Sequence, residues 1–227
     1  MNLDLYKYIY LIGVGGIGMS GLARYFHAKG KKVYGYDAVR SDLCKNLEKE
    51  GVSIHYDEHV KSISSVIIEA NYSETLIIYT PAICESNSIF QFFKEKGYPL
   101  FKRAEILGFI SKNSYTIAVA GTHGKTTTSS MLAHILRDSG FSCTAFLGGI
   151  STNYNTNLIL SDQENILIVE ADEYDRSFLY LNPDIAIITS LDSDHLDIYS
   201  DYQQLVLAFK QFASQVKNKG LLLVEKN

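Results

Sequence analysis

Two glycine-rich turns, each placed between a β-like run and a helical stretch, constrain this sequence more than any other feature. Residues 11–21 read LIGVGGIGMSG, and residues 118–128 read AVAGTHGKTTT. An apolar run followed by a glycine-rich turn and a helix is typical of α/β proteins that hold phosphate groups on backbone N–H groups and a helix N-terminus. The sequence therefore predicts two phosphate-binding loops in one α/β chain.

Short β-branched runs alternate with helical patterns along the chain, which is typical of parallel sheets covered by helices. We expect strands at residues 7–15, 31–37, 52–56, 65–70, 75–83, 99–103, 116–121, 143–149, 165–172, 184–192 and 220–226, and helices at 17–29, 41–50, 125–139 and 201–217. The polar segment SKNSY (111–115) is the best linker candidate. The predicted fold is α/β, with a Rossmann-like parallel-sheet domain over 1–112 and an incomplete P-loop central domain over 113–227.

Bulk composition excludes several functional classes. The formal net charge is −4, so the chain offers no basic field for nucleic acid. No apolar run approaches the ~18 residues that a membrane span needs. The three cysteines, Cys44, Cys84 and Cys143, lie far apart and are interpreted as buried, reduced thiols. We therefore expect a cytoplasmic protein without nucleic-acid or membrane partners.

The first loop carries Gly13, Gly15 and Gly18 in a G-x-G-x-x-G pattern. This pattern provides a tight turn and lets a diphosphate approach the backbone, and Asp37 follows at the distance where an acid receives ribose hydroxyls. Glycines that merely permit a tight βα turn are the alternative interpretation. The motif specifies two phosphates and a ribose but not nicotinamide, so NAD is one candidate ligand among several.

The second loop ends in Gly124, Lys125 and Thr126, as in a P-loop. Lysine would reach the terminal phosphates of a nucleoside triphosphate, and the threonine hydroxyl would bind Mg²⁺. The first glycine of the usual pattern would fall on Val119, so the sequence departs from the standard form, and Gly121 provides a shorter turn.

Acidic residues follow two successive apolar strands, at the sheet edge where α/β proteins bind ligands. Such carboxylates could complete a magnesium site beside Thr126. The candidates are Glu170, Asp172, Glu173 and Asp175 after the first strand, and Asp192, Asp194, His195 and Asp197 after the second. Any one of these acids could instead be a solvated charge or a helix cap, and Asp197 and Asp201 fit that alternative best.

The segments GTHGKTTT (121–128), EADEYDRSFLYLNPDIAIIT (170–189) and DSDHLDIY (192–199) resemble the Mur ligases, ATP-dependent amide-forming enzymes of peptidoglycan synthesis. The N-terminal IGVGGIGMSGLA, TPAI (80–83) and KRAEIL (102–107) are most similar to the branch of the family that joins L-alanine to UDP-N-acetylmuramate. The resemblance covers essentially the whole chain in the correct order.

The resemblance implies that the first loop holds UDP-N-acetylmuramate rather than a dinucleotide. The implied sugar-nucleotide residues are Gly13, Gly15, Gly16, Gly18, Asp37, Thr80, Pro81, Ala82 and Asn157. ATP would lie on Gly121, Thr122, His123, Gly124, Lys125, Thr126 and Thr127. Thr126, Glu170 and His195 match magnesium ligands, and Lys125, His123 and His195 match catalytic positions. Lys210, which some family members carbamylate, is interpreted as a solvated helix residue.

The implied reaction proceeds through an acyl phosphate on the sugar nucleotide, which the amine of L-alanine then attacks. Members of the family carry a further domain that binds the amino acid, and it has no counterpart here, so we expect a truncated chain that is inactive alone. Three alternatives stay open: a murein-peptide ligase that uses the same sugar nucleotide, an NAD-dependent oxidoreductase, and a non-catalytic nucleotide-binding regulator.

Overall fold

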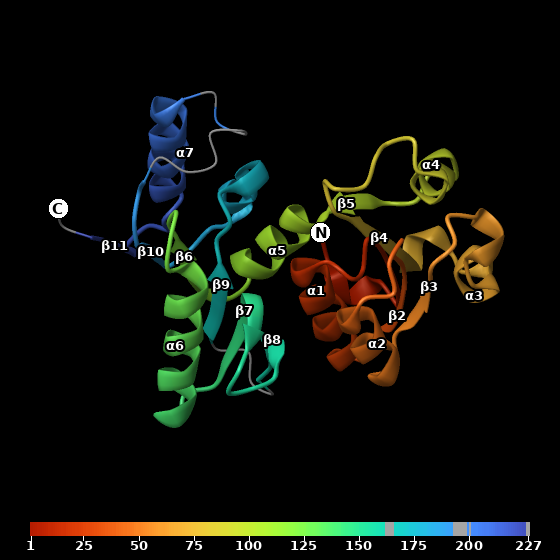
Figure 1. Cartoon of the computed structure of the whole chain (residues 1–227), viewed down its shortest axis with the longest axis horizontal. Helices are drawn as coiled ribbons and strands as arrows, with labels where there is room; N and C mark the ends of the chain where they lie inside the picture. The colour runs from red at the N-terminus through yellow and green to blue at the C-terminus, as the bar shows by residue number, and fades with distance from the viewer. Residues whose placement is uncertain (162–165, 193–198, 200, 226–227) are drawn as a thin grey trace. The chain divides into compact units, whose positions relative to one another are not determined.

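The computed structural model describes residues 1–161, 166–192, 199 and 201–225. The chain divides into two compact units, Met1–Ile106 and Leu107–Asn227 (Figure 1). The division falls inside helix α5 (Arg103–Lys112). The domain boundary proposed from the sequence, between residues 112 and 113, lies at the end of this same helix.

The first unit is built on a five-stranded parallel sheet in the order β3-β2-β1-β4-β5. Strand β1 is central and pairs with β2 on one side and with β4 on the other. The strands are β1 (Tyr8–Ile12), β2 (Lys32–Tyr36), β3 (Ser53–His55), β4 (Thr75–Tyr79) and β5 (Leu100–Lys102). The α-helices between them are α1 (Ile17–Ala28), α2 (Asp42–Lys49), α3 (Ser65–Glu69) and α4 (Ser88–Glu95).

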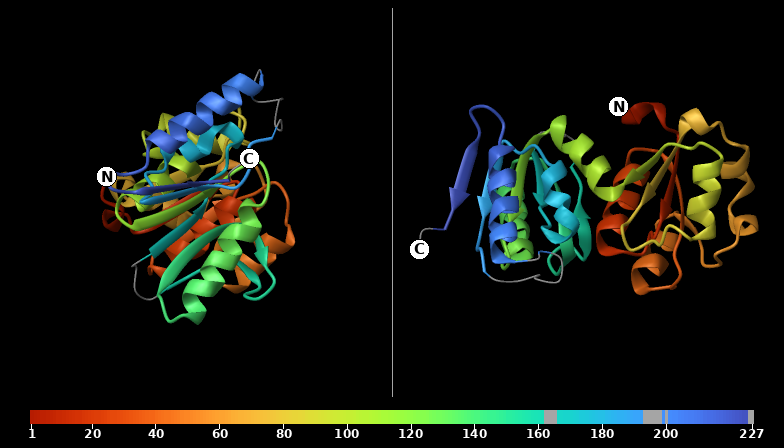
Figure 2. Two further views of the ribbon diagram at one scale, coloured as in Figure 1. Left: turned by 90° about the vertical axis from the view of Figure 1, so that its left-hand side faces the viewer. Right: turned by 90° about the horizontal axis from the view of Figure 1, so that it is seen from above.

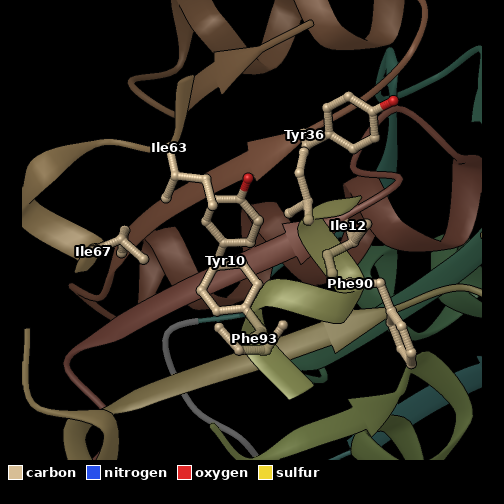
Figure 3. Close-up of a cluster of buried hydrophobic side chains, with 9 residues drawn as sticks. Tyr10, Ile12, Tyr36, Ile63, Ile67, Phe90 and Phe93 are labelled. Atoms are coloured by element: carbon tan, nitrogen blue, oxygen red, sulfur yellow. The ribbon is translucent and has the colours of Figure 1, made fainter. Parts of the chain in front are cut away.

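Alternate side chains of β1 enter different parts of the core because successive residues of a strand point to opposite faces. Tyr10 and Ile12 pack with Phe90 and Phe93 of α4 in a buried cluster that also contains Ile67 (Figure 3). The rings of Tyr10 and Phe93 lie 4.8 Å apart between centroids and are tilted by 54°. This packing fixes the position of β1 in the core, and the first glycine loop leaves its carboxyl end.

One predicted strand is wrong. Residues 65–70 were expected to be extended because they are β-branched, but Ser65–Glu69 forms helix α3. Ile63 and Ile67, four residues apart, are buried, whereas Val66 and Ile68 are exposed. Within α3 only Ile67 is buried, so the β propensity of the individual residues does not decide the local structure here.

The second unit has a six-stranded sheet in the order β11-β10-β6-β9-β7-β8. Its pairs are parallel except for β7 with β8, which form an antiparallel hairpin. The strands are β6 (Tyr115–Ala120), β7 (Cys143–Ser151), β8 (Thr156–Ile159), β9 (Ile166–Glu170), β10 (Ile185–Ile188) and β11 (Leu221–Val224). Five of these strands were expected from the sequence, and β8 was not.

Helices α6 (Lys125–Asp138) and α7 (Tyr202–Ser214) cover opposite faces of this sheet (Figure 2). Ala133 of α6 packs on Cys143, Ala145 and Ile168 in a buried cluster. Strand β6 lies between β10 and β9, so the second glycine loop, which follows β6, meets the ends of both neighbouring strands. The acidic segments expected from the sequence follow those same two strands.

Cys44 and Cys143 are buried as expected, but Cys84 is exposed. Its thiol lies in the loop after β4, where it contacts the hydroxyl of Ser86 at 3.0 Å. No helix among the described residues is long and apolar enough to cross a bilayer.

Candidate nucleotide-binding sites

The first glycine loop joins β1 to α1 and requires glycine where the sequence predicted it. Gly13 has φ +86°, a left-handed conformation that side chains disfavour, and a Cβ there would lie 2.7 Å from the methyl group of Thr80. The N–H groups of Gly13 and Val14 donate to the carbonyl of Tyr36 at 2.8 and 3.1 Å. The loop is thus fastened to the carboxyl end of β2, and Gly13 and Thr80 come together.

Asp37 lies against the loop. Its Oδ2 accepts the N–H of Gly15 at 2.8 Å, and its Oδ1 accepts the N–H of Val39 at 3.0 Å. A Cβ on Gly15 would lie 2.5 Å from the sulfur of Cys44 and 2.9 Å from Oδ2 of Asp37. The glycine therefore permits close contact between the loop and the acid that the sequence analysis paired with it.

The first turn of α1 supplies no acidic side chain and no side-chain cap of its own, and Gly16 is the N-cap. The guanidinium of Arg103 packs directly over Gly18, where a Cβ would lie 2.6 Å from Nη1. A helix end of this kind favours a bound anion. Pro81 and Ala82 follow β4 and are exposed.

The second loop joins β6 to α6 and is also shaped by glycine. Gly121 has φ +136° and Gly124 has φ +79°. A Cβ on Gly121 would lie 2.9 Å from the backbone N of Ser190, because β10 ends directly beside the loop. Gly124 is the N-cap of α6, whose first turn likewise contains no acid. The shorter turn expected from the missing first glycine is present.

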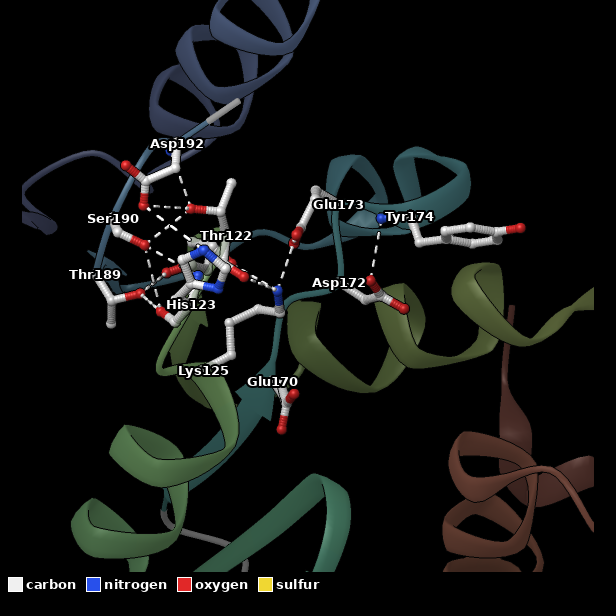
Figure 4. A network of polar contacts seen from close by, with 12 residues as sticks. Thr122, His123, Lys125, Glu170, Asp172, Glu173, Tyr174, Thr189, Ser190 and Asp192 are labelled. Carbon is white, nitrogen blue, oxygen red and sulfur yellow. Dashed lines mark hydrogen bonds and ion pairs between the residues drawn. The ribbon is translucent and has the colours of Figure 1, made fainter. Parts of the chain in front are cut away.

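Residues after β10 fasten the loop from one side (Figure 4). The hydroxyls of Thr122 and Ser190 are 2.9 Å apart, and Ser190 Oγ accepts the N–H of His123 at 2.9 Å. Thr122 Oγ1 accepts the N–H of Asp192 at 3.0 Å. The His123 ring is exposed and lies 3.8 Å from the carboxylate of Asp192.

Lys125 lies at the mouth of the loop between its own turn and the segment after β9. Its Nζ donates to Gly121 O at 2.6 Å and contacts Glu173 Oε1 at 2.8 Å. The side chain of Glu173 is fully buried, and that of Lys125 is 14% exposed. Glu173 was a magnesium candidate in the sequence, and in the structure it pairs with the lysine.

Thr126 and Glu170 form an oxygen-rich pair beside the N-terminus of α6. The threonine hydroxyl donates to Oε1 of Glu170 at 2.8 Å, and Oε2 accepts the N–H of Gly148 at 2.7 Å. A Cβ on Gly148 would lie 2.6 Å from Cδ of Glu170. A carboxylate and a hydroxyl are hard oxygen donors, so this pair fits Mg²⁺.

Other predicted acids have different positions. Asp172 accepts the N–H of Tyr174 at 3.0 Å within its own turn, and Asp201 caps α7 by accepting the N–H of Gln204 at 2.8 Å. Asp194, His195 and Asp197 lie outside the described residues. Across the part of the chain that is described, no group of three or more His, Cys, Asp or Glu side chains could hold a metal ion.

The remaining candidates lie on α6, β8 and α7. Thr127 is exposed on α6 and lines a hollow of about 270 Å³ with Thr126 and Thr152. Asn157 is 1% exposed in β8. Lys210 is exposed on α7.

Sequence reasoning missed two contributors to the second site, Gly148 and Ser190. Gly148 belongs to a GG pair in β7, and a glycine inside a strand often marks close approach by another group. That signal was present in the sequence. Ser190 gave no comparable signal.

Comparison with known proteins identifies both halves of the chain. The model described as "Mur ligase family, catalytic domain" matches residues 8–115, and the "Mur ligase middle domain" matches residues 119–227. A UDP-N-acetylmuramate--L-alanine ligase of Flavobacterium johnsoniae is 50% identical over 228 residues, covering 100% of this chain and 49% of the relative. A protein of that name from Cytophaga hutchinsonii is 49% identical over 226 residues, covering 98% and 48%. The chain thus spans about half the length of these curated relatives.

Two solved structures of ligases match nearly the whole chain. A UDP-N-acetylmuramate:L-alanyl-γ-D-glutamyl-meso-diaminopimelate ligase from Neisseria meningitidis matches with a TM-score of 0.87 and 26% identity, covering 98% of this chain and 72% of that one. A UDP-N-acetylmuramate-alanine ligase from Thermotoga maritima matches with a TM-score of 0.82 and 27% identity, covering 96% and 48%.

Proposed function

This chain belongs to the Mur ligase family, and we propose that it serves the ATP-dependent joining of L-alanine to the lactyl carboxylate of UDP-N-acetylmuramate in peptidoglycan precursor synthesis. The curated relatives that are 49–50% identical over the whole chain carry that activity in their names. The single structural observation that carries the proposal is the second loop, where Lys125 and the Thr126–Glu170 pair meet at the N-terminus of α6.

The second loop is suited to a nucleoside triphosphate. Backbone N–H groups at the start of α6 and the ammonium of Lys125 supply positive charge for the β- and γ-phosphates of ATP. Thr126 and Glu170 would hold Mg²⁺, which when bound neutralises developing charge on the phosphates. His195 stays a proposed ligand from the family pattern, and His123 is exposed on the loop where an acyl phosphate would form.

Transfer of the γ-phosphoryl group to the lactyl carboxylate would give an acyl phosphate and ADP. The amine of L-alanine would then attack the acyl carbon and displace phosphate, leaving an amide. Such reactions depend mainly on positioning and on charge neutralisation. Lys125 would neutralise charge on the transferred group, and Ser190 and Thr122 would keep the loop in shape.

The first loop would hold the UDP portion of the sugar nucleotide. UDP and NAD share a diphosphate and a ribose, so Gly13, Gly15, Gly18 and Asp37 would keep the same physical roles with either ligand. The sugar nucleotide is preferred because the family model that matches residues 8–115 includes this loop. Gly16, Thr80, Pro81, Ala82 and Asn157 remain proposed contributors.

The acceptor could also be a peptide rather than L-alanine. One specific observation favours that alternative: the Neisseria ligase, whose name gives a tripeptide as the second substrate, has the higher TM-score, 0.87 against 0.82. Its sequence identity is only 26%, however, against 49–50% for the curated alanine ligases. The large difference in sequence identity outweighs the small difference in TM-score, so L-alanine is the preferred acceptor.

Titration calorimetry with UDP-N-acetylmuramate, NAD⁺ and ATP with Mg²⁺ tests the proposal. We expect binding of the sugar nucleotide and of ATP, and none of NAD⁺. The variant Gly15→Ala should lose the sugar nucleotide but keep ATP, since the two loops belong to separate units. Binding of NAD⁺ without the sugar nucleotide would contradict the proposal for the first loop.

A further inference from the structure

The partner of Lys125 is unusual for a phosphate-binding lysine because it is a wholly buried carboxylate. The ammonium has three N–H donors and meets three acceptors: Gly121 O at 2.6 Å, Glu173 Oε1 at 2.8 Å and Thr122 O at 3.5 Å. The last contact is at the limit of a hydrogen bond and is the weakest of the three. A phosphate oxygen can replace it without disturbing the other two.

Departure of Lys125 from Glu173 would be costly. The Glu173 side chain is 0% exposed, so a lysine that swung outward to follow a ligand would have to break an ion pair to a buried carboxylate. The ion pair therefore stays intact when an anion arrives. Phosphate must come to the lysine, rather than the lysine to the phosphate.

Glu173 is itself held in place from behind. Its backbone carbonyl accepts the hydroxyl of Tyr199 at 2.7 Å and the N–H of Arg176 at 3.0 Å. Tyr199 is fully buried, and the Arg176 guanidinium lies 5.6 Å from the centre of its ring. Burial raises the pKa of Tyr199 to about 12, so its hydroxyl keeps the proton that it donates.

The backbone after Glu173 has a conformation that only its surroundings can impose. Asp175 and Arg176 both lie in the left-handed region, with φ of +52° and +55°. Two consecutive non-glycine residues there are strained, and strain of this kind persists where neighbouring contacts fix the chain. Tyr199 supplies such a contact.

We propose that Glu173 is a positioning residue that holds Lys125 at the mouth of the second loop, and that Tyr199 anchors Glu173 for this role. The inference rests on the proposed function, because it concerns the lysine that would meet ATP. It adds that the affinity of the loop for terminal phosphates depends on a buried carboxylate, although that carboxylate carries the same sign of charge as the ligand.

The sign of the effect makes the inference testable. If Glu173 merely offset the charge of Lys125, Glu173→Gln would free positive charge and tighten ATP binding. If it positions the lysine, exchanging the charge-assisted contact for a neutral one should weaken binding of ATP with Mg²⁺ by about tenfold. AMP, which lacks the β- and γ-phosphates, should bind equally to both proteins. Tyr199→Phe should also weaken ATP binding, by a smaller factor.

The experiment uses calorimetry of the full 227-residue chain with ATP, ADP and AMP in the presence of Mg²⁺. Asp184→Asn is the matched control, because Asp184 forms a partly buried pair with Lys217 at 2.8 Å in the same unit. Thermal melting accompanies each titration to show that the variants are folded. If Glu173→Gln fails to fold, Tyr199→Phe alone decides the question.

Unchanged or tighter ATP binding by folded Glu173→Gln would overturn the inference and leave the proposed function intact. An equal loss with ATP and AMP would also overturn it, since that pattern shows general damage. If the unsubstituted chain binds no ATP, both the proposed function of this loop and the inference fail.

Discussion

Substitution of Gly148 by alanine should displace Glu170 and damage the proposed magnesium site. A Cβ at this position would lie 2.6 Å from Cδ of the carboxylate and 2.8 Å from Oε2. The clashing atoms are the far end of a flexible side chain, so Glu170 can escape by rotating away from β7. It would then give up its contacts with Thr126 and Gly148 at 2.8 and 2.7 Å.

The magnitude follows from those two contacts. Hydrogen bonds to a charged group contribute about 1.5–3 kcal/mol each, and the lower end applies at this partly exposed edge. Rotation lets water satisfy part of the loss, so the net destabilisation should be about 2 kcal/mol. For a unit of this size, that corresponds to a fall in melting temperature of roughly 8 °C. Binding of ATP should also lose most of its dependence on Mg²⁺.

Gly149→Ala is the internal control. Its added Cβ would lie 3.4 Å from the methyl group of Thr126, which is close to ordinary contact and does not involve Glu170. Calorimetric melting and ATP titration with and without Mg²⁺ compare the two variants. Equal melting temperatures and equal magnesium dependence for both would refute the idea that Gly148 makes room for Glu170.

Three further results are expected. Gly15→Ala should lower affinity for UDP-N-acetylmuramate at least tenfold in calorimetry, since its Cβ would lie 2.5 Å from Cys44 Sγ; unchanged affinity would contradict the geometry. Lys125→Met should cost about 3 kcal/mol in urea denaturation because it removes the ammonium paired with the buried Glu173 carboxylate. The double variant Lys125→Met/Glu173→Gln should recover part of the loss, and a double variant less stable than the single one would count against this. The raised pKa of Tyr199 means that folding favours the neutral phenol. Its contribution to the free energy of unfolding is therefore complete below pH 10 and is lost as pH rises through about 12. In a Tyr199→Phe chain the free energy of unfolding should fall less steeply with alkaline pH, and identical slopes in the two chains would contradict the assignment.

The glycine loops and the order of most elements could be predicted because each rests on local chemistry. Gly13, Gly121 and Gly124 adopt backbone conformations that favour glycine, and this requirement is visible in the sequence itself. A helix was predicted over residues 125–139, and α6 spans Lys125–Asp138, so it begins at the predicted lysine.

Features that depend on distant contacts could not be predicted. The segment Ser65–Glu69 contains three β-branched residues and nevertheless forms a helix, with Ile67 in the core cluster that contains Tyr10. Strand β8 owes its extended form to antiparallel pairing with β7. Glu170 is the last residue of β9 and Glu173 follows three residues later, and only the fold shows that Glu173 meets the lysine and Glu170 the threonine.

The contacts of Asp37 leave it with a defined remaining capacity. An ionised carboxylate offers about four acceptor sites. Among the described residues, the N–H of Gly15 occupies one site on Oδ2, and that of Val39 occupies one on Oδ1. One site therefore remains on each oxygen, which matches the two adjacent hydroxyls of a ribose. The loop and a nucleotide could thus share this single acid without competing for it.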